Sequence, residues 1–287
     1  MKVGLSTHSL VKVISNGQMN VLDAIGWIAK NGGEHVEIVP SGYTITGNKQ
    51  LIEDIVNKVK EVGLDISSYT IGANFLQSSQ EAYRTEIERL KKEVDIASEL
   101  GVKLMRHDVA YRPPEEASQE QFEKDLPVLA DACREIAEHA AQYGIITSVE
   151  NHGYHIQHSE RVLRLVKLVG MENYRITLDI GNFIAIDEDP LASTKKMMAL
   201  ASLVHVKDFY IRNKNKNPGE GFLTTAGGNF KRGAIVGHGD MDIRGIFKTL
   251  KTNGYDGYIS IEFAGMEDCL LASKISMDNT RRLWNEM

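Results

Sequence analysis

Four side chains in the second half of the chain can bind a cation, and each lies within or directly after an apolar, strand-like stretch. They are Glu150, Asp179, His205 and Glu262. The Ile, Val and Thr residues before them favour buried strands. A charge at the end of such a strand is unfavourable unless a cation or a shared proton compensates it. The sequence therefore predicts that these four side chains surround one cation.

The composition of this donor set indicates which ion it would hold. Three carboxylates and one imidazole suit a hard or intermediate divalent ion, so Mn²⁺ is the first choice, with Mg²⁺, Co²⁺ and Zn²⁺ as alternatives. A single acidic residue at a strand end more often caps the next helix, and a single histidine more often bonds to the backbone. Four such residues on consecutive strands favour a site for one divalent metal ion.

Eight strand-like segments alternate with helix-like segments along the chain. The predicted strands are 3–6, 35–39, 64–71, 102–107, 144–150, 176–179, 203–208 and 258–262. This alternation predicts a single (β/α)₈ TIM barrel domain over residues 1–287, with an active site at the carboxyl ends of the strands. A doubly wound sheet would need a glycine-rich phosphate turn after its first strand, and residues 6–10 contain no glycine.

Bulk properties narrow the possible partners. The chain has 287 residues, of which 25% are charged, and a net charge of −6. The acidic balance argues against a nucleic acid or an anionic membrane as partner. No run of about 18 apolar residues and no secretory signal are found, so a cytoplasmic protein is expected. Cys133 and Cys269 are not expected to form a disulfide.

Several motifs resemble one family over nearly the whole chain. They are Val36-Glu37-Ile38, Val149-Glu150-Asn151-His152, Leu178-Asp179-Ile180-Gly181-Asn182, His205-Val206-Lys207-Asp208 and Gly237-His238-Gly239-Asp240, followed by Ile261-Glu262. With these motifs the chain resembles the xylose isomerase-like TIM barrels, the sugar phosphate isomerase/epimerase family. Ketose 3-epimerases, hydroxypyruvate isomerases and keto-inositol dehydratases belong to that group.

The resemblance implies both a metal site and a reaction. Glu150, Asp179, His205 and Glu262 would bind one divalent ion, and Glu150 and Glu262 would exchange a proton with a keto-sugar or sugar phosphate. An ion that chelates a carbonyl and its neighbouring hydroxyl stabilises the enediolate left by deprotonation. The first prediction is a metal-dependent sugar isomerase or epimerase. The alternative is a lyase that performs β-elimination on a keto-sugar. Two departures from the family pattern leave it open: Asn182 stands where members often carry His, and His238 where many carry an acidic residue.

Further residues are predicted to contact the carbohydrate substrate. They are Glu37, His107, His152, Lys207, Arg212 and His238. Lys207 shares strand parity with His205, so both should face the barrel interior. Residues 213–235 form a long glycine-rich and polar connection, which is expected to be an active-site loop. A subunit contact, or a short hairpin around residues 222–224, is the alternative for this segment. A homo-oligomer is left open.

Overall fold

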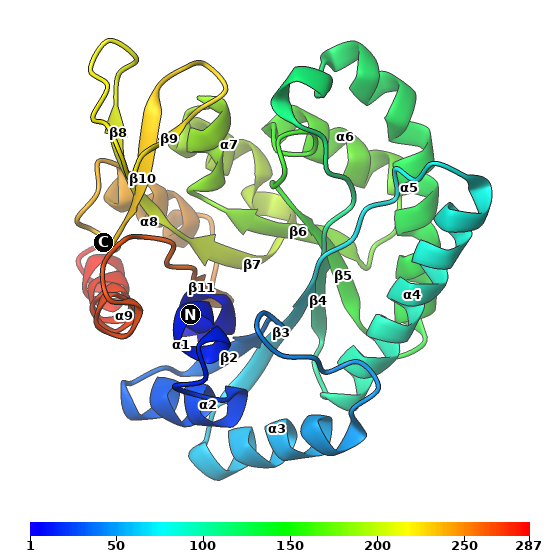
Figure 1. Ribbon diagram of the computed structural model, residues 1–287, viewed down its shortest axis with the longest axis horizontal. Helices are drawn as coiled ribbons and strands as arrows, with labels where there is room; N and C mark the ends of the chain where they lie inside the picture. The colour runs from blue at the N-terminus through cyan, green and yellow to red at the C-terminus, as the bar shows by residue number, and fades with distance from the viewer.

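Eight parallel strands close into a barrel in the computed structural model, which describes residues 1–287 (Figure 1). Around the barrel the strand order is β1-β11-β7-β6-β5-β4-β3-β2. The strands are β1 (Lys2–Ser6), β2 (His35–Ile38), β3 (Asp65–Ile71), β4 (Leu104–His107), β5 (Ile146–Glu150), β6 (Tyr174–Asp179), β7 (Ala201–Val206) and β11 (Tyr258–Ile261). The predicted single (β/α)₈ barrel is confirmed, and each predicted strand lies within a few residues of its predicted position.

Helices follow the strands and cover the outside of the barrel (Figure 1). The α-helices are α1 (Val11–Ser15), α2 (Val21–Lys30), α3 (Lys49–Val62), α4 (Gln80–Glu99), α5 (Gln119–Ala141), α6 (Ser159–Val169), α7 (Pro190–Met197), α8 (Ile243–Thr252) and α9 (Cys269–Asn285). Short 3₁₀ helices are η1 (Thr7–Leu10), η2 (Pro114–Glu116), η3 (Asn182–Ile186) and η4 (Met198–Leu200). None of these helices combines the length and the apolar character needed to cross a bilayer.

Side chains alternate along each strand between the helix-facing side and the barrel interior. The helix-facing side chains, such as Val149 and Leu178, belong to one large buried apolar cluster. Polar and small side chains face inward, and the hydroxyl groups of Ser148 and Thr177 lie 2.8 Å apart there. Because the interior is already polar near the carboxyl ends of the strands, charged side chains at those ends find partners instead of apolar neighbours.

A separate three-stranded antiparallel sheet lies beside the barrel mouth, next to α7 and α8 (Figure 1). Its order is β8 (Asp208–Arg212), β10 (Phe230–Ala234) and β9 (Leu223–Thr224). The predicted loop at 213–235 is therefore partly folded, and β9 lies where the hairpin alternative placed a strand.

Two attachments hold this sheet to the barrel. The carboxylate of Asp187, at the end of η3, accepts hydrogen bonds from the Thr225 hydroxyl (2.9 Å), the Gly227 N–H (2.6 Å) and the Asn229 amide (2.7 Å). On the other side, Gly233 of β10 forms a backbone bridge with Gly265, which follows β11. The sheet thus spans from the end of β6 to the end of β11.

Candidate metal centre and substrate pocket

The four predicted ligands meet at the carboxyl ends of β5, β6, β7 and β11. One donor atom from each of Glu150, Asp179, His205 and Glu262 lies within 4.8 Å of the others, and all four residues are buried. Asp179 and His205 are direct neighbours in the β6–β7 register. Parallel strands of a closed barrel bring their ends to one rim, which is why residues separated by more than one hundred positions converge.

Glu37 of β2 orients His205 from beneath. Its Oε2 lies 2.9 Å from His205 Nε2, and it accepts hydrogen bonds from the hydroxyl groups of Thr70 (2.5 Å) and Ser260 (2.7 Å). His205 Nδ1 instead faces Glu150 (3.3 Å) and Glu262 (3.7 Å). With Nε2 engaged by a carboxylate, Nδ1 is the nitrogen directed at the cluster. Partners of this kind fix the orientation of metal-binding imidazoles.

Backbone groups hold Asp179 in a defined orientation. Its Oδ1 accepts hydrogen bonds from the N–H groups of Gly181 (2.7 Å) and Asn182 (2.9 Å). A Cβ at Gly181 would lie 2.8 Å from Lys207 Cβ and 2.9 Å from the Phe209 ring, so only glycine fits between them. The second oxygen of Asp179 is buried and lies 2.7 Å from Lys207 Nζ.

Two cationic side chains compensate the carboxylates. Lys207 Nζ lies 2.8 Å from Glu262, and Arg106 lies 2.5 Å from Glu150 and 2.7 Å from Asp108. Burial alone would raise the pKa of Glu150, but the charges of Arg106, His205 and Lys207 outweigh it and hold that pKa well below its usual range. In the same way, Lys207 and His205 overcome burial and lower the pKa of Glu262 to about 2.

These residues fit a divalent ion. Cationic neighbours lower the pKa values of Glu150 and Glu262, Asp179 adds a third carboxylate, and one imidazole nitrogen is directed at Glu150 and Glu262. Burial by itself lowers the pKa of His205, yet Glu37, Glu262 and Glu150 raise it well above its ordinary value. The cluster therefore favours positive charge at its centre, which a metal ion would supply in place of the imidazole proton.

A cavity of about 250 Å³ opens directly above the cluster. Its lining residues are His8, Val39, Ser41, Thr70, Ile71, Gly72, Arg106, Asp108, Glu150, His152, Lys207 and Glu262. This volume is slightly below the range of about 300–1,000 Å³ that small-molecule sites occupy, so the ligand must be small. Charged and polar groups dominate the lining.

His152 lines this cavity and is held by Asp108. His152 Nδ1 lies 3.0 Å from Asp108 Oδ1, and the imidazole is 49% exposed. Burial would lower the pKa of His152, but the hydrogen bond and charge of Asp108 overcome this and raise it. Asp108 thus holds the imidazole at the cavity wall, two residues after Glu150 in the sequence.

Four predicted substrate contacts lie outside this cavity. Arg106 faces the barrel interior, so the next residue in the strand, His107, faces the helices. There it is buried between Phe75 and Tyr174. Arg212 pairs with Asp240 at 2.8 Å, outside the cavity. Neither side chain lines the pocket above the cluster. Glu37 also lies beneath the cluster and not in the cavity lining.

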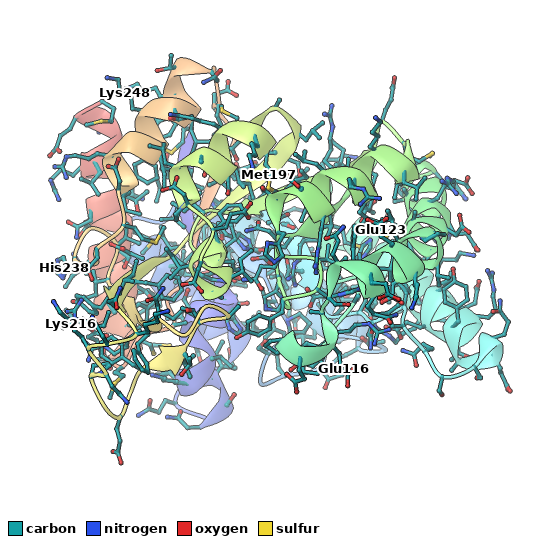
Figure 2. The ribbon with its side chains drawn as sticks, turned by 90° about the horizontal axis from the view of Figure 1, so that it is seen from above. Glu116, Glu123, Met197, Lys216, His238 and Lys248 are labelled. Atoms are coloured by element: carbon teal, nitrogen blue, oxygen red, sulfur yellow. The ribbon has the colours of Figure 1, made fainter.

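His238 is exposed in a turn at the edge of the molecule (Figure 2). The turn folds around Asp208, whose Oδ2 accepts hydrogen bonds from the N–H groups of Gly237 and Gly239, both at 2.9 Å. A Cβ at Gly239 would lie 2.2 Å from Asp208 Oδ1. The Gly-x-Gly motif therefore serves a backbone turn, and the histidine in its middle points away from the pocket.

Sequence reasoning missed Arg106, Asp108 and His8, which all line the cavity. A signal for two of them was present. Arg106 and Asp108 are two positions apart at the end of β4, so they share the parity of an inward-facing pair. For His8, which follows β1 in a 3₁₀ turn, the sequence offers no comparable signal.

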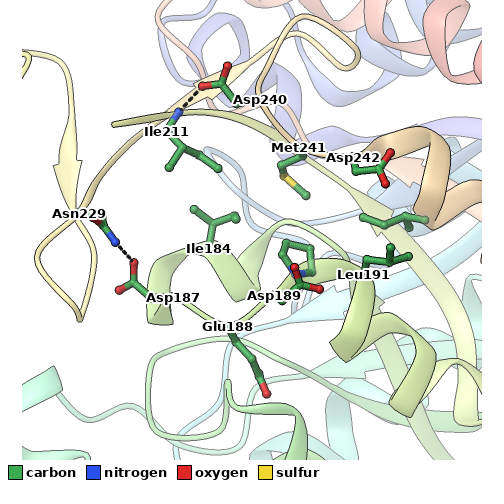
Figure 3. Close-up of a pocket in the computed structure, with 12 residues that line it drawn as sticks. Ile184, Asp187, Glu188, Asp189, Leu191, Ile211, Asn229, Asp240, Met241 and Asp242 are labelled. Carbon is green, nitrogen blue, oxygen red and sulfur yellow. Dashed lines mark hydrogen bonds between the residues drawn. The ribbon is translucent and has the colours of Figure 1, made fainter. Parts of the chain in front are cut away.

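A second cavity, of about 490 Å³, lies between η3, α7, β8 and α8 (Figure 3). Several carboxylates line it, but each already has backbone partners. Asp189 and Asp242 cap α7 and α8, Asp240 accepts from the Ile211 N–H, and Asp187 holds the β8–β10 sheet. These acidic groups serve the fold, and the cavity is separate from the four-residue cluster.

Comparisons with known proteins agree with this architecture. A family model described as "xylose isomerase-like TIM barrel" matches residues 25–283. An inosose dehydratase from Clostridium botulinum is 26% identical over 186 residues, which cover 63% of this chain and 60% of that protein. The chain therefore spans three fifths of the length of this curated relative.

Solved structures resemble the chain over nearly its full length. The IOLI protein, crystallised with a zinc atom, superimposes with a TM-score of 0.77 at 16% identity, covering 100% of this chain and 99% of that one. A D-psicose 3-epimerase in the presence of D-fructose gives a TM-score of 0.75 at 15% identity, covering 99% of both chains. At these identities the likeness extends to the fold alone.

Proposed function

Because the chain belongs to the family of xylose isomerase-like TIM barrels, we propose that it is a metal-dependent enzyme that deprotonates a carbon next to the carbonyl of a keto-sugar. The ion would be held by Glu150, Asp179, His205 and Glu262, and Mn²⁺ remains the first choice. The observation that carries this proposal is the convergence of four buried donor groups beneath a small polar cavity.

The bound ion would withdraw electron density from the carbonyl oxygen and so acidify the neighbouring C–H bond. Glu150 and Glu262 both line the cavity and are ionised, so either can accept the proton from carbon. Lys207 and Arg106 keep these carboxylates charged and can donate hydrogen bonds to sugar oxygens. Glu37 acts through His205, whose ring it orients.

For the second half of the reaction we favour β-elimination, which makes the enzyme a lyase. Elimination needs a group that protonates the departing oxygen, and His152, oriented by Asp108 at the cavity wall, is suited to that task. The similarity to an inosose dehydratase supports the same choice. This reverses the order of the two hypotheses from the sequence, in which isomerisation came first.

Isomerisation or epimerisation remains the second candidate. It requires that one carboxylate remove a proton and that another return it, and both Glu150 and Glu262 line the cavity. Neither isomerisation nor epimerisation needs His152. The two candidates thus share their first step and differ in the group that completes the reaction.

Residues 213–235 are proposed to cover the mouth of the active site. The sheet that they complete extends from the end of β6 to the end of β11, two strands that carry cluster residues. Limited proteolysis with and without a turnover-competent sugar tests this role. Protection of the segment by the sugar is expected, and equal cleavage rates would contradict it.

The experiment that tests the reaction uses metal-loaded protein in deuterated water. Inosose and neutral ketohexoses are incubated with it, and NMR follows deuterium incorporation next to the carbonyl together with the products. Elimination predicts exchange with loss of water, and epimerisation predicts exchange with a stereoisomer as product. No exchange with any keto-sugar, at full metal occupancy, would contradict both candidates.

A further inference from the structure

Lys231 lies on β10, the central strand of the three-stranded sheet, and outside the lining of the cavity above the cluster. Its Nζ is 4.6 Å from the centroid of the Phe209 ring. That ring in turn contacts the backbone near Gly181, where an added Cβ would lie 2.9 Å from the ring and 2.8 Å from Lys207 Cβ. Lys231 and Phe209 are therefore stacked beside the ends of β6 and β7, which carry Asp179 and His205.

Lys231 has no acidic partner. Its ammonium group makes no ion pair within 4.0 Å and donates no hydrogen bond to another residue, whereas within that distance Lys207 contacts three carboxylates and Arg106 two. The next residue, Arg232, points to the opposite face of the sheet and lies over Tyr210 and Phe222 at 4.8 and 5.2 Å. The sheet thus directs one unpaired cation towards the barrel.

The surroundings of Lys231 disfavour an unpaired charge. Burial, together with the charge of Lys207, lowers its pKa to about 8, and Asp179 only partly offsets them. Metal binding would not provide a partner. A divalent ion and the Lys207 ammonium are both positively charged, so neither can pair with the Lys231 ammonium. The Lys231 ammonium therefore stays without a charged partner beside the cluster.

We propose that Lys231 binds an anionic group of the substrate, a phosphate or a carboxylate, so that the substrate is an acidic keto-sugar. That the substrate is a keto-sugar rests on the proposed function. The anionic group would lie against Phe209 and Lys231, above the ends of β6 and β7. A buried or half-buried ammonium that gains a charged hydrogen-bond partner is strongly stabilised, which makes Lys231 a specificity-determining residue.

The test compares D-fructose, D-fructose 6-phosphate and the keto-acid D-fructuronate as substrates for exchange in the metal-loaded enzyme. The variant is Lys231→Met, with Lys231→Arg as the conservative replacement and Lys214→Met, an exposed residue of the same segment, as the matched control. We expect Lys231→Met to raise the KM for one acidic sugar about tenfold or more. The KM for D-fructose and all kcat values should change less than about threefold, and Lys231→Arg should restore the KM.

A raised KM for D-fructose 6-phosphate would indicate that Lys231 binds a phosphate, and a raised KM for D-fructuronate would indicate a carboxylate. An equal change in KM for neutral and acidic sugars would overturn the inference, because it would indicate a structural role. No change for either acidic sugar would overturn it as well.

A binding measurement separates this inference from the proposed function. Metal-free wild type and Lys231→Met are titrated with inorganic phosphate and with acetate by calorimetry, so that neither anion can coordinate the ion. One anion should bind the wild type at least about fivefold more tightly than the variant. If no keto-sugar exchanges a proton but this difference is found, the proposed reaction fails and the anion site stands. Equal binding to both proteins overturns the anion site.

Discussion

The carboxylate of Glu37 lies 2.9 Å from Nε2 of His205, at the bottom of the four-residue cluster. Both side chains are fully buried, and the remaining oxygen of Glu37 is occupied by Thr70. Since Nε2 is engaged, the imidazole can offer only Nδ1 to an ion. We therefore propose that Glu37 positions His205 for metal binding, in contrast to the substrate contact expected from the sequence.

The first prediction follows from this pair. Glu37→Gln should weaken metal binding about 10- to 100-fold, because the amide no longer fixes the imidazole as a charged partner does. The dissociation constant for Mn²⁺, measured by calorimetry, checks it. Glu93→Gln is the matched control, since Glu93 is also a buried carboxylate but lies far from the cluster against Tyr69. Unchanged Mn²⁺ affinity with raised KM would favour the original substrate-contact hypothesis.

Glu150→Gln and Glu262→Gln should each lower proton exchange at the substrate carbon by at least about 100-fold. An amide cannot accept the proton, even where it still coordinates the ion weakly. Exchange is followed by NMR in deuterated water, and the metal content of each variant is measured so that loss of the ion is recognised. A metal-loaded variant that keeps exchange within about tenfold of wild type, equivalent to roughly 1.4 kcal/mol, would exclude that glutamate as the base.

His152→Gln and Asp108→Asn decide between elimination and epimerisation. If His152 protonates the leaving group, product formation should fall about 100-fold or more in both variants, while carbon–hydrogen exchange continues. Asp240→Asn, outside the cavity, serves as the control. Wild-type rates of product formation in both variants would remove the main support for elimination and return epimerisation to first place.

Lys207→Met should make the fold dependent on metal. In the metal-free protein Lys207 contacts Asp179 and Glu262, and removing one partner of buried ion pairs typically costs about 3–5 kcal/mol of unfolding free energy. Bound Mn²⁺ should recover much of this loss, because it supplies positive charge to the same carboxylates. Urea unfolding with Mn²⁺ or with a chelator measures both states. A loss of the same size in both would show that Lys207 acts through packing instead.

Stability should also fall between pH 6.5 and about 4 because of His107. Burial lowers the pKa of His107 from 6.5 to about 4, so in this window the unfolded chain binds a proton that the folded chain does not. The contribution is complete above pH 6.5 and is lost as the pH falls through the window, by up to about 1.4 kcal/mol per pH unit. His107→Gln should flatten this slope in urea unfolding series. His238→Gln, in the exposed turn, should leave it unchanged.

The sequence by itself determined the order of strands and helices and the four donor residues of the cluster. Apolar runs of four to eight residues, separated by helical periodicity and glycine stops, are local signals, so they do not depend on the rest of the fold. The donors were recognisable because Glu150, Asp179 and Glu262 each end an apolar strand, where a charge is unfavourable unless a cation or a shared proton compensates it. Once the parallel strands close into a barrel, their carboxyl ends lie at one rim, so these donors come together.

Only the tertiary structure decided which neighbouring side chain enters the pocket. Arg106 and His107 are adjacent in the sequence, and the register of β4 turns the arginine inward and the histidine towards Phe75. The same applies to Lys231, whose position depends on how β10 pairs with β8 and docks on the barrel. A shift by one residue reverses the face of every side chain in a strand, and register is set by contacts between segments that are distant in the sequence.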